Sequence, residues 1–291
     1  MGILGIFLVF LCGCGPQKTE EIPEEPPKAQ QETVAEEPAA ETEEARTYVL
    51  AADDFGNLQL SDGAVPVYDK YTLEERRARG LSTTLPEITP YREKKMAYLT
   101  FDDGPDEKNT PAILDILKKE KAKATFYVLG RSAQAYPDVV RRIFEEGHAI
   151  GNHSYDHEYG KLYASTGNYL AELEQTDEIL RDLIGVRPLI TRAPGGRMGN
   201  FTAAYGQAME QNGYVEHDWN VSSADTAPNH PVAQDFIDNI DAGATMQSVI
   251  ILMHSSAGHE ETVKALPGII RILKERGYSF GVVTPMTPQP W

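Results

Sequence analysis

Cysteine and long hydrophobic runs are both scarce in this sequence. The only two cysteines among its 291 residues, Cys12 and Cys14, lie close to the N-terminus. A disulfide-stapled scaffold and a cysteine-ligated zinc site are therefore excluded for the rest of the chain. No run of about 20 apolar residues is present, so the sequence predicts no membrane-spanning helix in the mature protein.

Positive charge is scarce as well. The chain has 27 Lys and Arg against 44 Asp and Glu, which gives a net charge of −17 at pH 7. The first 46 residues hold ten glutamates and three basic residues, and the remaining 245 residues still carry a net charge of −10. Such an acidic body argues against nucleic acid, or an anionic bilayer surface, as an electrostatic partner.

The N-terminal residues have the pattern of a leader. The apolar run 3–11 is too short to span a bilayer and has the length of a signal-peptide core. The Leu-Cys-Gly-Cys sequence that follows resembles the leader of bacterial lipoproteins, which implies a signal peptide over residues 1–14, a lipid on Cys14 and an anchor on the outside of the cell membrane. No Lys or Arg precedes the apolar run. The alternative is a plain secretory signal cleaved near Gly15, which would give a secreted protein.

Residues 15–46 are rich in Glu, Pro, Gln, Ala and Thr. Such a segment buries too little apolar surface to offset the entropy of ordering, so we expect a disordered linker. A flexible coil of this length spans roughly 30 Å and can hold a domain away from a membrane. We expect residues 47–95 to form an extended arm that packs on the main domain.

From Met96 onward, short apolar runs alternate with amphipathic segments. The apolar runs cover residues 96–101, 124–129, 149–151, 188–192, 214–219, 249–253 and 278–283. Helical periodicity covers residues 110–120, 137–146, 169–184, 202–212, 232–242 and 262–276. Helix-stop glycines follow or end several of these segments: Gly147, Gly185, Gly213, Gly243 and Gly277. The alternation predicts an α/β fold with parallel strands closed or nearly closed into a barrel, helices outside, and chemistry at the carboxyl ends of the strands.

Two adjacent carboxylates, Asp102 and Asp103, follow the first predicted strand. At a strand end they project in different directions, so one can bind a metal while the other faces a substrate. An Asp-Gly-Pro turn that caps the next helix explains the same residues equally well.

Two histidines, His153 and His157, follow the third predicted strand. Histidines four residues apart share a face if the segment turns helically, and both can then bind one metal. With Asp103 they would supply two nitrogens and one oxygen, the open three-ligand site of a catalytic zinc or a similar ion. We expect His148, beside a helix stop, to be a cap or a surface residue.

Polar residues also follow the fourth and sixth predicted strands. Arg192 stands beside a Pro-Gly-Gly turn and can hold a carboxylate, although an ordinary surface loop is the alternative. His254 ends the sixth strand, and with Asp225 upstream we interpret it as a general acid that Asp225 orients. A histidine at the end of an apolar run can also be a satisfied core residue.

Five motifs in this order resemble those of the polysaccharide deacetylase family, carbohydrate esterases that share the NodB homology domain. The motifs lie at residues 100–105, 153–157, 192–196, 219–225 and 252–254, and the resemblance covers about residues 96–285. It implies a distorted (β/α) barrel of about seven parallel strands, which agrees with the alternation above and which we assign to residues 96–287.

The resemblance also implies a set of site residues. Asp103, His153 and His157 would bind one divalent metal, with Zn²⁺ expected and Co²⁺, Mn²⁺ or Ni²⁺ as alternatives. Two further pairs would do the acid–base chemistry: Asp102 as general base held by Arg192, and His254 as general acid paired with Asp225.

The acetyl pocket and the sugar groove depart from the family pattern. Leu252 would line the pocket for the acetyl methyl and the Gly195 N–H would stabilise the oxyanion. The family commonly has Tyr where this chain has Gly195, Trp where it has Thr226, and Asp where it has Ser255. An aromatic side chain from elsewhere would then replace the missing platform, with three candidates: Trp219, Tyr68 and Tyr71.

The function implied is removal of N-acetyl groups from N-acetylglucosamine in a cell-surface polysaccharide. The expected tether favours peptidoglycan, while chitooligosaccharide, exopolysaccharide or acetylxylan are the alternatives. A third possibility, a non-catalytic glycan-binding lipoprotein, would be expected to lack an acid–base residue, and all of them are present. We expect a monomer whose partner is the polysaccharide and which reaches the membrane only through its lipid.

Overall fold

The computed structural model describes residues 47–60, 63–91 and 94–290. The predictions for the leader, for Cys14 and for the linker 15–46 lie outside these residues. All the described residues belong to one compact unit of the chain, residues 44–291. None of the helices in this part of the chain combines the length and the apolar character needed to cross a membrane.

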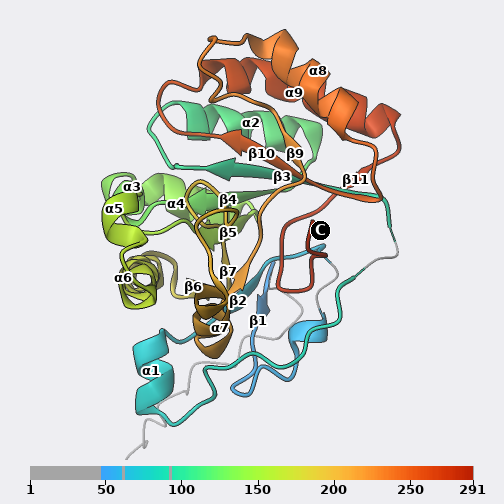
Figure 1. The fold of residues 1–291 in the computed structure, drawn as a ribbon. Helices are drawn as coiled ribbons and strands as arrows, with labels where there is room; N and C mark the ends of the chain where they lie inside the picture. Colours follow the sequence, from blue (N-terminus) through green and yellow to red (C-terminus); the bar gives the residue numbers. More distant parts are fainter. Residues whose placement is uncertain (1–46, 61–62, 92–93, 291) are drawn as a thin grey trace, which may run out of the picture. The chain divides into compact units, whose positions relative to one another are not determined.

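Short elements dominate the described chain (Figure 1). The strands are β1 Val49–Leu50, β2 Val67–Asp69, β3 Met96–Asp102, β4 Ala124–Val128, β5 Ala149–Asn152, β6 Arg187–Pro188, β7 Ile190–Thr191, β8 Val215–Glu216, β9 Val221–Ser222, β10 Ser248–His254 and β11 Ser279–Phe280. The helices are the 3₁₀ turn η2 Leu58–Leu60, and α1 Leu73–Ala78, α2 Asn109–Glu120, α3 Gly130–Ala135, α4 Pro137–Glu145, α5 Tyr159–Leu162, α6 Thr166–Ile184, α7 Ala203–Gln211, α8 Ala233–Gly243 and α9 Glu260–Glu275.

The main sheet is a curled half-barrel of parallel strands. Its order is β8-β7-β5-β4-β3-β10-β9, and β11 pairs with the start of β3. Every pairing found among its described strands is parallel. The predicted α/β barrel of about seven parallel strands is thus confirmed, with β8 and β9 as the two open edges in the described part of the chain.

Alternate residues of the central strands face opposite sides of the sheet. Leu99 of β3 and Ile251 of β10 belong to the core that the helices cover, and α2, α8 and α9 lie along β3 and β10 on that side (Figure 1). Tyr98 and Ile250 pack together on the inner side. Because successive side chains of a strand point to opposite faces, the next inward residues of β3 include Asp102, at the carboxyl end of the strand.

One of the predicted elements is wrong. The predicted strand 214–219 is interrupted after β8, and the chain forms a separate short strand, β9, before it reaches Asp225. Gly243 is the last residue of α8, as predicted. A Cβ there would come within 2.9 Å of Val221, so close packing of α8 on β9 explains this glycine.

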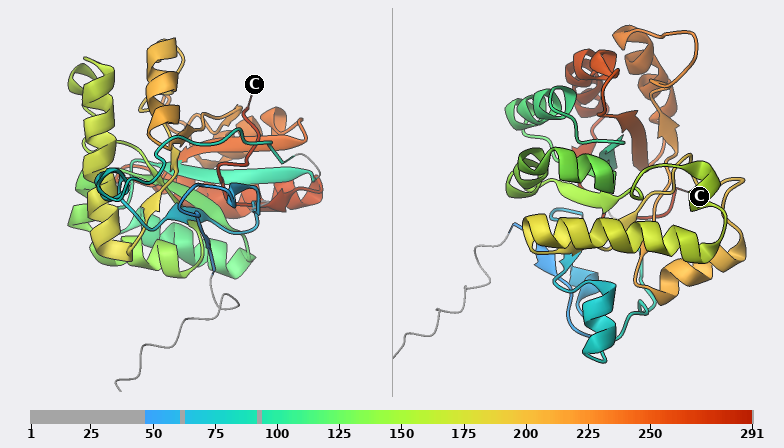
Figure 2. Two further views of the ribbon diagram at one scale, coloured as in Figure 1. Left: turned by 90° about the horizontal axis from the view of Figure 1, so that it is seen from below. Right: turned by 90° about the vertical axis from the view of Figure 1, so that its left-hand side faces the viewer.

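The segment before residue 96 pairs with the rest of the unit through a second, small sheet. Its order is β1-β2-β6, and β2 runs antiparallel to β6, with Tyr68 opposite Pro188. Since β6 immediately precedes β7, the arm is attached beside one of the strands of the half-barrel. The two further views in Figure 2 show this part of the chain from other sides.

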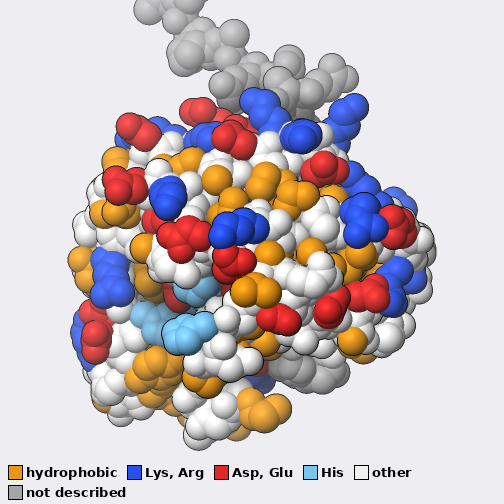
Figure 3. All heavy atoms as spheres, turned by 90° about the horizontal axis from the view of Figure 1, so that it is seen from above, with side chains coloured by type: hydrophobic (Ala, Val, Ile, Leu, Met, Phe, Trp, Pro, Cys, Tyr) orange, Lys and Arg blue, Asp and Glu red, His pale blue; other side chains and the backbone are white. Residues whose placement is uncertain are grey.

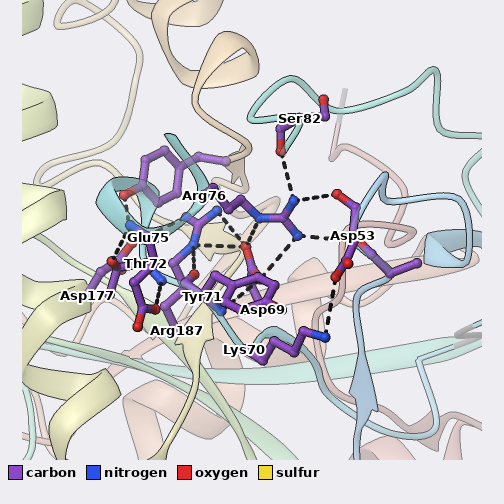
Figure 4. A network of polar contacts seen from close by, with 12 residues as sticks. Asp53, Asp69, Lys70, Tyr71, Thr72, Glu75, Arg76, Ser82, Asp177 and Arg187 are labelled. Atoms are coloured by element: carbon purple, nitrogen blue, oxygen red, sulfur yellow. Dashed lines mark hydrogen bonds and ion pairs between the residues drawn. The ribbon is translucent and has the colours of Figure 1, made fainter. Parts of the chain in front are cut away.

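A buried ionic network holds the arm in place (Figure 4). Asp69, at the end of β2, accepts hydrogen bonds from the guanidinium groups of Arg76 and Arg187. Arg187 also contacts Asp177 of α6 at 3.3 Å, and Tyr214 donates to the same carboxylate at 2.7 Å. All four charged side chains are almost completely buried. The network therefore joins the arm, α6 and β6 through groups that have no access to water.

Candidate active site

The candidate residues Asp102 and Asp103 lie where β3 ends. Asp102 is buried, and Asp103 follows in a left-handed backbone conformation with a φ of 68°. Asp102 Oδ1 accepts a hydrogen bond from Arg192 Nη1 at 2.9 Å, whereas Asp103 Oδ1 lies 3.4 Å from His153 Nε2. The two neighbouring carboxylates thus face different partners.

Arg192, directly after β7, is fully buried and satisfies its donors within the protein. Besides Asp102, its Nη1 donates to Thr100 Oγ1 at 2.6 Å, and Thr100 lies two residues earlier on the same face of β3. Nε and Nη2 donate to the backbone carbonyls of His217 and Asp218 at 2.9 and 3.2 Å. This arrangement fixes the side chain of Asp102 against a rigid cation.

The segment that carries His153 and His157 is a loop rather than the helical turn considered from the sequence. Ser154 and His157 have positive φ values of 72° and 63°, so the backbone curls instead of continuing as a helix. Two backbone N–H groups of the loop donate to the buried carboxylate of Glu172 on α6. The two imidazoles still meet, with their ring centroids 5.3 Å apart.

Asp103, His153 and His157 have the donor set and the spacing of a metal site. Their ligand atoms lie within 4.8 Å of one another. His153 Nδ1 is 2.8 Å from the Arg192 carbonyl oxygen, so Nδ1 carries the proton and Nε2 is available to a metal. Asp103 Oδ1 is buried and accepts no hydrogen bond from the described residues, although it lies 3.4 and 3.7 Å from the Nε2 atoms of the two histidines. A buried carboxylate oxygen left without a partner beside two imidazoles fits a divalent cation.

The charge of this cluster supports the same interpretation. Burial by itself raises the pKa of Asp103, but the neighbouring His153 outweighs burial and holds the pKa well below its usual range. The carboxylate is therefore ionised at neutral pH, which is the form that binds a cation.

His254, the last residue of β10, is held by Asp225. His254 Nδ1 lies 2.9 Å from Asp225 Oδ1, and the backbone N–H of His254 donates to Asp225 Oδ2 at 2.7 Å. Burial by itself lowers the pKa of His254, but the hydrogen bond and the charge of Asp225 outweigh burial and raise the pKa to about 9. The imidazole is therefore protonated at neutral pH, as a general acid must be.

A second group of possible ligands lies at this end of β10. Asp225, His254 and His259 also offer ligand atoms within 4.8 Å of one another, and the rings of the two histidines stack at a centroid distance of 5.1 Å. Here, however, both oxygens of Asp225 already accept hydrogen bonds, with Thr262 Oγ1 as a further donor at 2.9 Å. A metal would have to displace these bonds, so the Asp103 cluster fits a cation better.

The loop after Arg192 exposes a backbone donor. Gly195 and Gly196 have positive φ values of 72° and 79°, a conformation that favours glycine. Gly196 N–H bonds back to Ala193 O at 2.8 Å, whereas Gly195 N–H has no acceptor among the described residues. An exposed N–H on a tight turn suits a developing negative charge.

Leu252 and Trp219 are the two residues expected to line a pocket. Leu252 is an inward residue of β10, nearly buried, and pairs in register with Thr100. Trp219 is partly buried and packs against the inner cluster of the half-barrel. Its ring lies close to Gly196, where an added Cβ would come within 3.0 Å of it. Both residues are thus available as walls of a pocket.

The structure bears on three expectations about nearby residues. His148 is buried rather than on the surface, but it takes part in the cap of α4, the other expected role: its backbone N–H bonds to Ile143 O at 3.2 Å, and its Nδ1 accepts the backbone N–H of Ala124 at 3.2 Å. Tyr68 is buried in the arm, where its hydroxyl bonds to the backbone of His148 and Ile150, so its ring is closed to a substrate. The ring of Tyr71 packs against basic side chains of the arm.

Sequence patterns gave no sign of a carboxyl pair that supports the Gly195 loop. Glu216 Oε1 accepts the Ala193 N–H at 3.4 Å, and the Asp218 carboxylate accepts the Arg197 N–H at 3.1 Å. The pair thus holds the loop at both ends. Burial, and then the charge of Asp218, raise the pKa of Glu216 well above its usual range, which favours the protonated form of this carboxyl group.

The histidines mark this region on the surface. In Figure 3, histidine side chains lie together on one part of the visible face, with carboxylates and hydrophobic side chains around them. The right-hand view of Figure 2 looks at the side toward which the arrowheads of β3 and β10 point in Figure 1. Asp102 ends β3, His254 ends β10 and Arg192 directly follows β7, so ionisable groups gather at the carboxyl ends of the strands, as expected for an α/β enzyme.

Comparison with known proteins identifies the family. The model of the polysaccharide deacetylase domain matches residues 90–217. A peptidoglycan-N-acetylglucosamine deacetylase of Bacillus cereus is 36% identical over 204 residues, which cover 69% of this chain and 73% of the relative. The chain therefore belongs to the polysaccharide deacetylase family, a family of hydrolases.

Solved structures agree with this assignment. A polysaccharide deacetylase from Bacillus cereus superposes with a TM-score of 0.61 at 36% identity, covering 65% of this chain and 92% of that one. The catalytic domain of a peptidoglycan N-acetylglucosamine deacetylase from Eubacterium rectale gives a TM-score of 0.64 at 30% identity, covering 70% and 95%. The resemblance stated from the five motifs is thus confirmed.

Proposed function

We propose that the protein removes N-acetyl groups from N-acetylglucosamine residues of peptidoglycan in a metal-dependent reaction. One observation carries the proposal: β3 and β10 pair in register, so Asp102 stands directly opposite His254. Adjacent strands lie about 4.8 Å apart, so both residues are close enough for one to act as base and the other as acid on a single bound amide, which supports the proposal. The names of the relatives support the choice of peptidoglycan.

The proposal assigns the metal to one group of ligands. Asp103, His153 and His157 would hold it. A bound divalent cation polarises the amide carbonyl and, in the case of zinc, lowers the pKa of the attacking water to about 7.

The protein's own groups would carry the protons. Asp102, fixed by Arg192, removes a proton from the attacking water. The Gly195 N–H donates to the oxygen that becomes negatively charged as the carbon turns tetrahedral. His254, protonated and oriented by Asp225, then gives its proton to the departing sugar amine. The base and the acid each contribute roughly 10²- to 10⁴-fold in rate.

The acetyl group would lie between Leu252 and Trp219. Leu252 is an apolar residue on the inner face of β10, suited to the methyl group, and Trp219 offers an aromatic ring beside the Gly195 loop. These two residues would distinguish an acetyl group from a larger acyl group.

The site of action would be outside the cytoplasm. A lipid on Cys14 and a linker over residues 15–46 would tether a monomeric catalytic unit within reach of the cell wall. Replacing Cys14 by Ser should move the protein from the membrane fraction to the medium in cells that express the full chain. If the variant stays with the membrane, Cys14 is not the anchor.

Acetate release from purified peptidoglycan tests the function. We expect release by the purified protein with added Zn²⁺ or Co²⁺, its loss with a chelator, and its loss in Asp102→Asn. Chitooligosaccharide and acetylxylan are assayed beside peptidoglycan, and a faster reaction on either would transfer the assignment to that glycan. Metal binding without acetate release from any of the three would contradict the proposal.

A further inference from the structure

Tyr159 fills the space beside the Gly195 loop. A Cβ added to Gly195 would come within 2.7 Å of the Tyr159 hydroxyl oxygen and 3.0 Å of Cε1 of the same ring. Real Cβ atoms do not approach other atoms so closely, so a side chain at position 195 would compete for space with the ring of Tyr159 and force it to shift. The glycine that departs from the family motif is therefore matched by an aromatic ring from another part of the chain.

The same ring also touches the candidate metal site. Tyr159 is the first residue of α5, and Figure 1 shows α5 on the side toward which β3 and β10 point. Its ring meets the ring of His157 edge to face, at a centroid distance of 5.0 Å and an angle of 84°. Tyr159 thus bridges two parts of the site, the metal ligand His157 and the backbone donor Gly195.

Tyr159 is open to a ligand as well. Tyr159 as a residue is 48% exposed, which makes it one of the few large exposed hydrophobic residues of the described chain. No described residue forms a hydrogen bond with its hydroxyl, whereas the neighbouring Tyr163 donates to Pro194 O at 2.7 Å and is fixed by that bond. A rigid aromatic face with an unused donor at its tip suits a ligand that is apolar on one side and polar at its edge.

We propose that Tyr159 is a substrate-contacting residue whose ring packs against the acetamido sugar and whose hydroxyl donates a hydrogen bond to it. This inference rests on the proposed function, because it takes the ligand to be an N-acetylated sugar. A pyranose has an apolar face and hydroxyl groups at its rim, which matches the exposed ring and the free donor. The ring would thereby supply the platform that no side chain at position 195 can provide.

Two substitutions separate the ring from the hydroxyl. Tyr159→Phe should lower kcat/KM on the N-acetylglucosamine polymer about 3- to 10-fold, the value of one hydrogen bond. Tyr159→Ala should lower it about 10- to 100-fold, mainly through KM, because the platform is lost. Hydrolysis of a small aryl acetate that has no sugar should change less than twofold in either variant. Tyr71→Phe, whose ring contacts basic arm residues, is the matched control and should behave as the wild type.

The contact with His157 allows a competing explanation, which zinc affinity tests. If Tyr159 only positions His157, Tyr159→Phe and Tyr159→Ala will weaken Zn²⁺ binding in calorimetry and slow the aryl acetate as much as the glycan. That result would overturn the inference. Unchanged kinetics of both variants on the glycan would also overturn it. A wild-type protein that cleaves the aryl acetate but no N-acetylated glycan would instead overturn the proposed function.

The close approach of Tyr159 to Gly195 gives an independent test. Gly195→Ala should lose activity because of its positive φ and because its methyl group overlaps the Tyr159 hydroxyl. In Gly195→Ala/Tyr159→Ala the whole ring is removed and the overlap with it, so the two losses in kcat/KM should be clearly less than multiplicative. Fully multiplicative losses would show that the side chains do not compete for one space, and would contradict the inference.

Discussion

Asp225 holds His254 by two hydrogen bonds, one from the imidazole Nδ1 at 2.9 Å and one from the backbone N–H at 2.7 Å. The carboxylate therefore fixes both the ring and the end of β10 that carries it. Because Nδ1 faces Asp225, Nε2 is the nitrogen left to act on a substrate. A change at Asp225 should thus alter the proton affinity of His254 as well as its orientation.

Asp225→Asn should move the alkaline limb of the pH profile to lower pH. The pKa of His254 is raised to about 9, so the acid form is present below that pH and is lost as the pH rises through it. Without the charge of Asp225 the largest contribution that raises this pKa is lost, so the pKa of His254 falls, although Asp102 and Asp103 still raise it. The profile of kcat/KM between pH 6 and 10 measures this shift, with the exposed Asp182→Asn as control. An alkaline limb that stays in place would show that another group is the acid.

Zinc should bind to one of the two ligand groups only. Asp103 Oδ1 has no hydrogen bond within the described chain, whereas both oxygens of Asp225 are already used. We therefore expect calorimetry to show one Zn²⁺ bound per chain. Asp103→Asn should weaken the binding of zinc at least about 100-fold, whereas Asp225→Asn should bind zinc with nearly the wild-type affinity. If Asp225→Asn weakens zinc binding more than Asp103→Asn does, the metal belongs to the Asp225 group.

Glu216→Gln should flatten the dependence of stability on pH. The folded state holds a proton on Glu216 at pH values where the unfolded chain has lost it, because burial and Asp218 raise its pKa. The free energy of unfolding should therefore fall as the pH rises from the ordinary glutamate pKa, about 4.5, toward the raised value. The amide cannot ionise and keeps an acceptor for the Ala193 N–H. Urea unfolding at several pH values measures this, and the exposed Glu178→Gln should keep the wild-type slope.

Asp69→Asn should destabilise the whole unit. The carboxylate bonds to two buried guanidinium groups, and its loss leaves Arg76 and Arg187 short of countercharge. Breaking a buried pair in this way costs about 3–5 kcal/mol in the free energy of unfolding. Asp53→Asn removes an exposed ion pair with Lys70 and should change stability by less than about 1 kcal/mol. Equal effects of the two substitutions would show that the network contributes no more than a surface pair.

The sequence was sufficient to predict those features that depend on residues close together in the chain. The alternation of apolar runs with helical segments predicted the half-barrel, because a parallel strand buried on both faces requires a continuous apolar run such as that of β3. The position of Asp102 and Asp103 at the end of that run followed directly. The carboxyl ends of parallel strands lie together. Assigning the functional residues to these ends therefore predicted that side chains far apart in the sequence would be close in space.

The sequence was not sufficient to predict those features that depend on contacts between two distant segments of the chain. The loop of His153 and His157 depends on the carboxylate of Glu172, which no spacing within the loop reveals. The Gly195 motif was recognised as a departure, but its partner Tyr159 could be found only from the closeness of the two in space. The cap at His148 was predicted from the neighbouring glycine, but the burial of its side chain against the distant strand β4 was not.

The antiparallel pairing of β2 with β6 has a consequence for how such a protein can evolve. The half-barrel begins at Met96 in the hydrophobic pattern, yet Arg187 within it pairs with Asp69 of the segment before that residue as well as with Asp177 of α6. Recombination at the pattern's boundary would remove Asp69 and leave the buried Arg187 with one of its two carboxylate partners. A module that keeps this network intact therefore begins before β2, so the arm would have to be inherited together with the half-barrel.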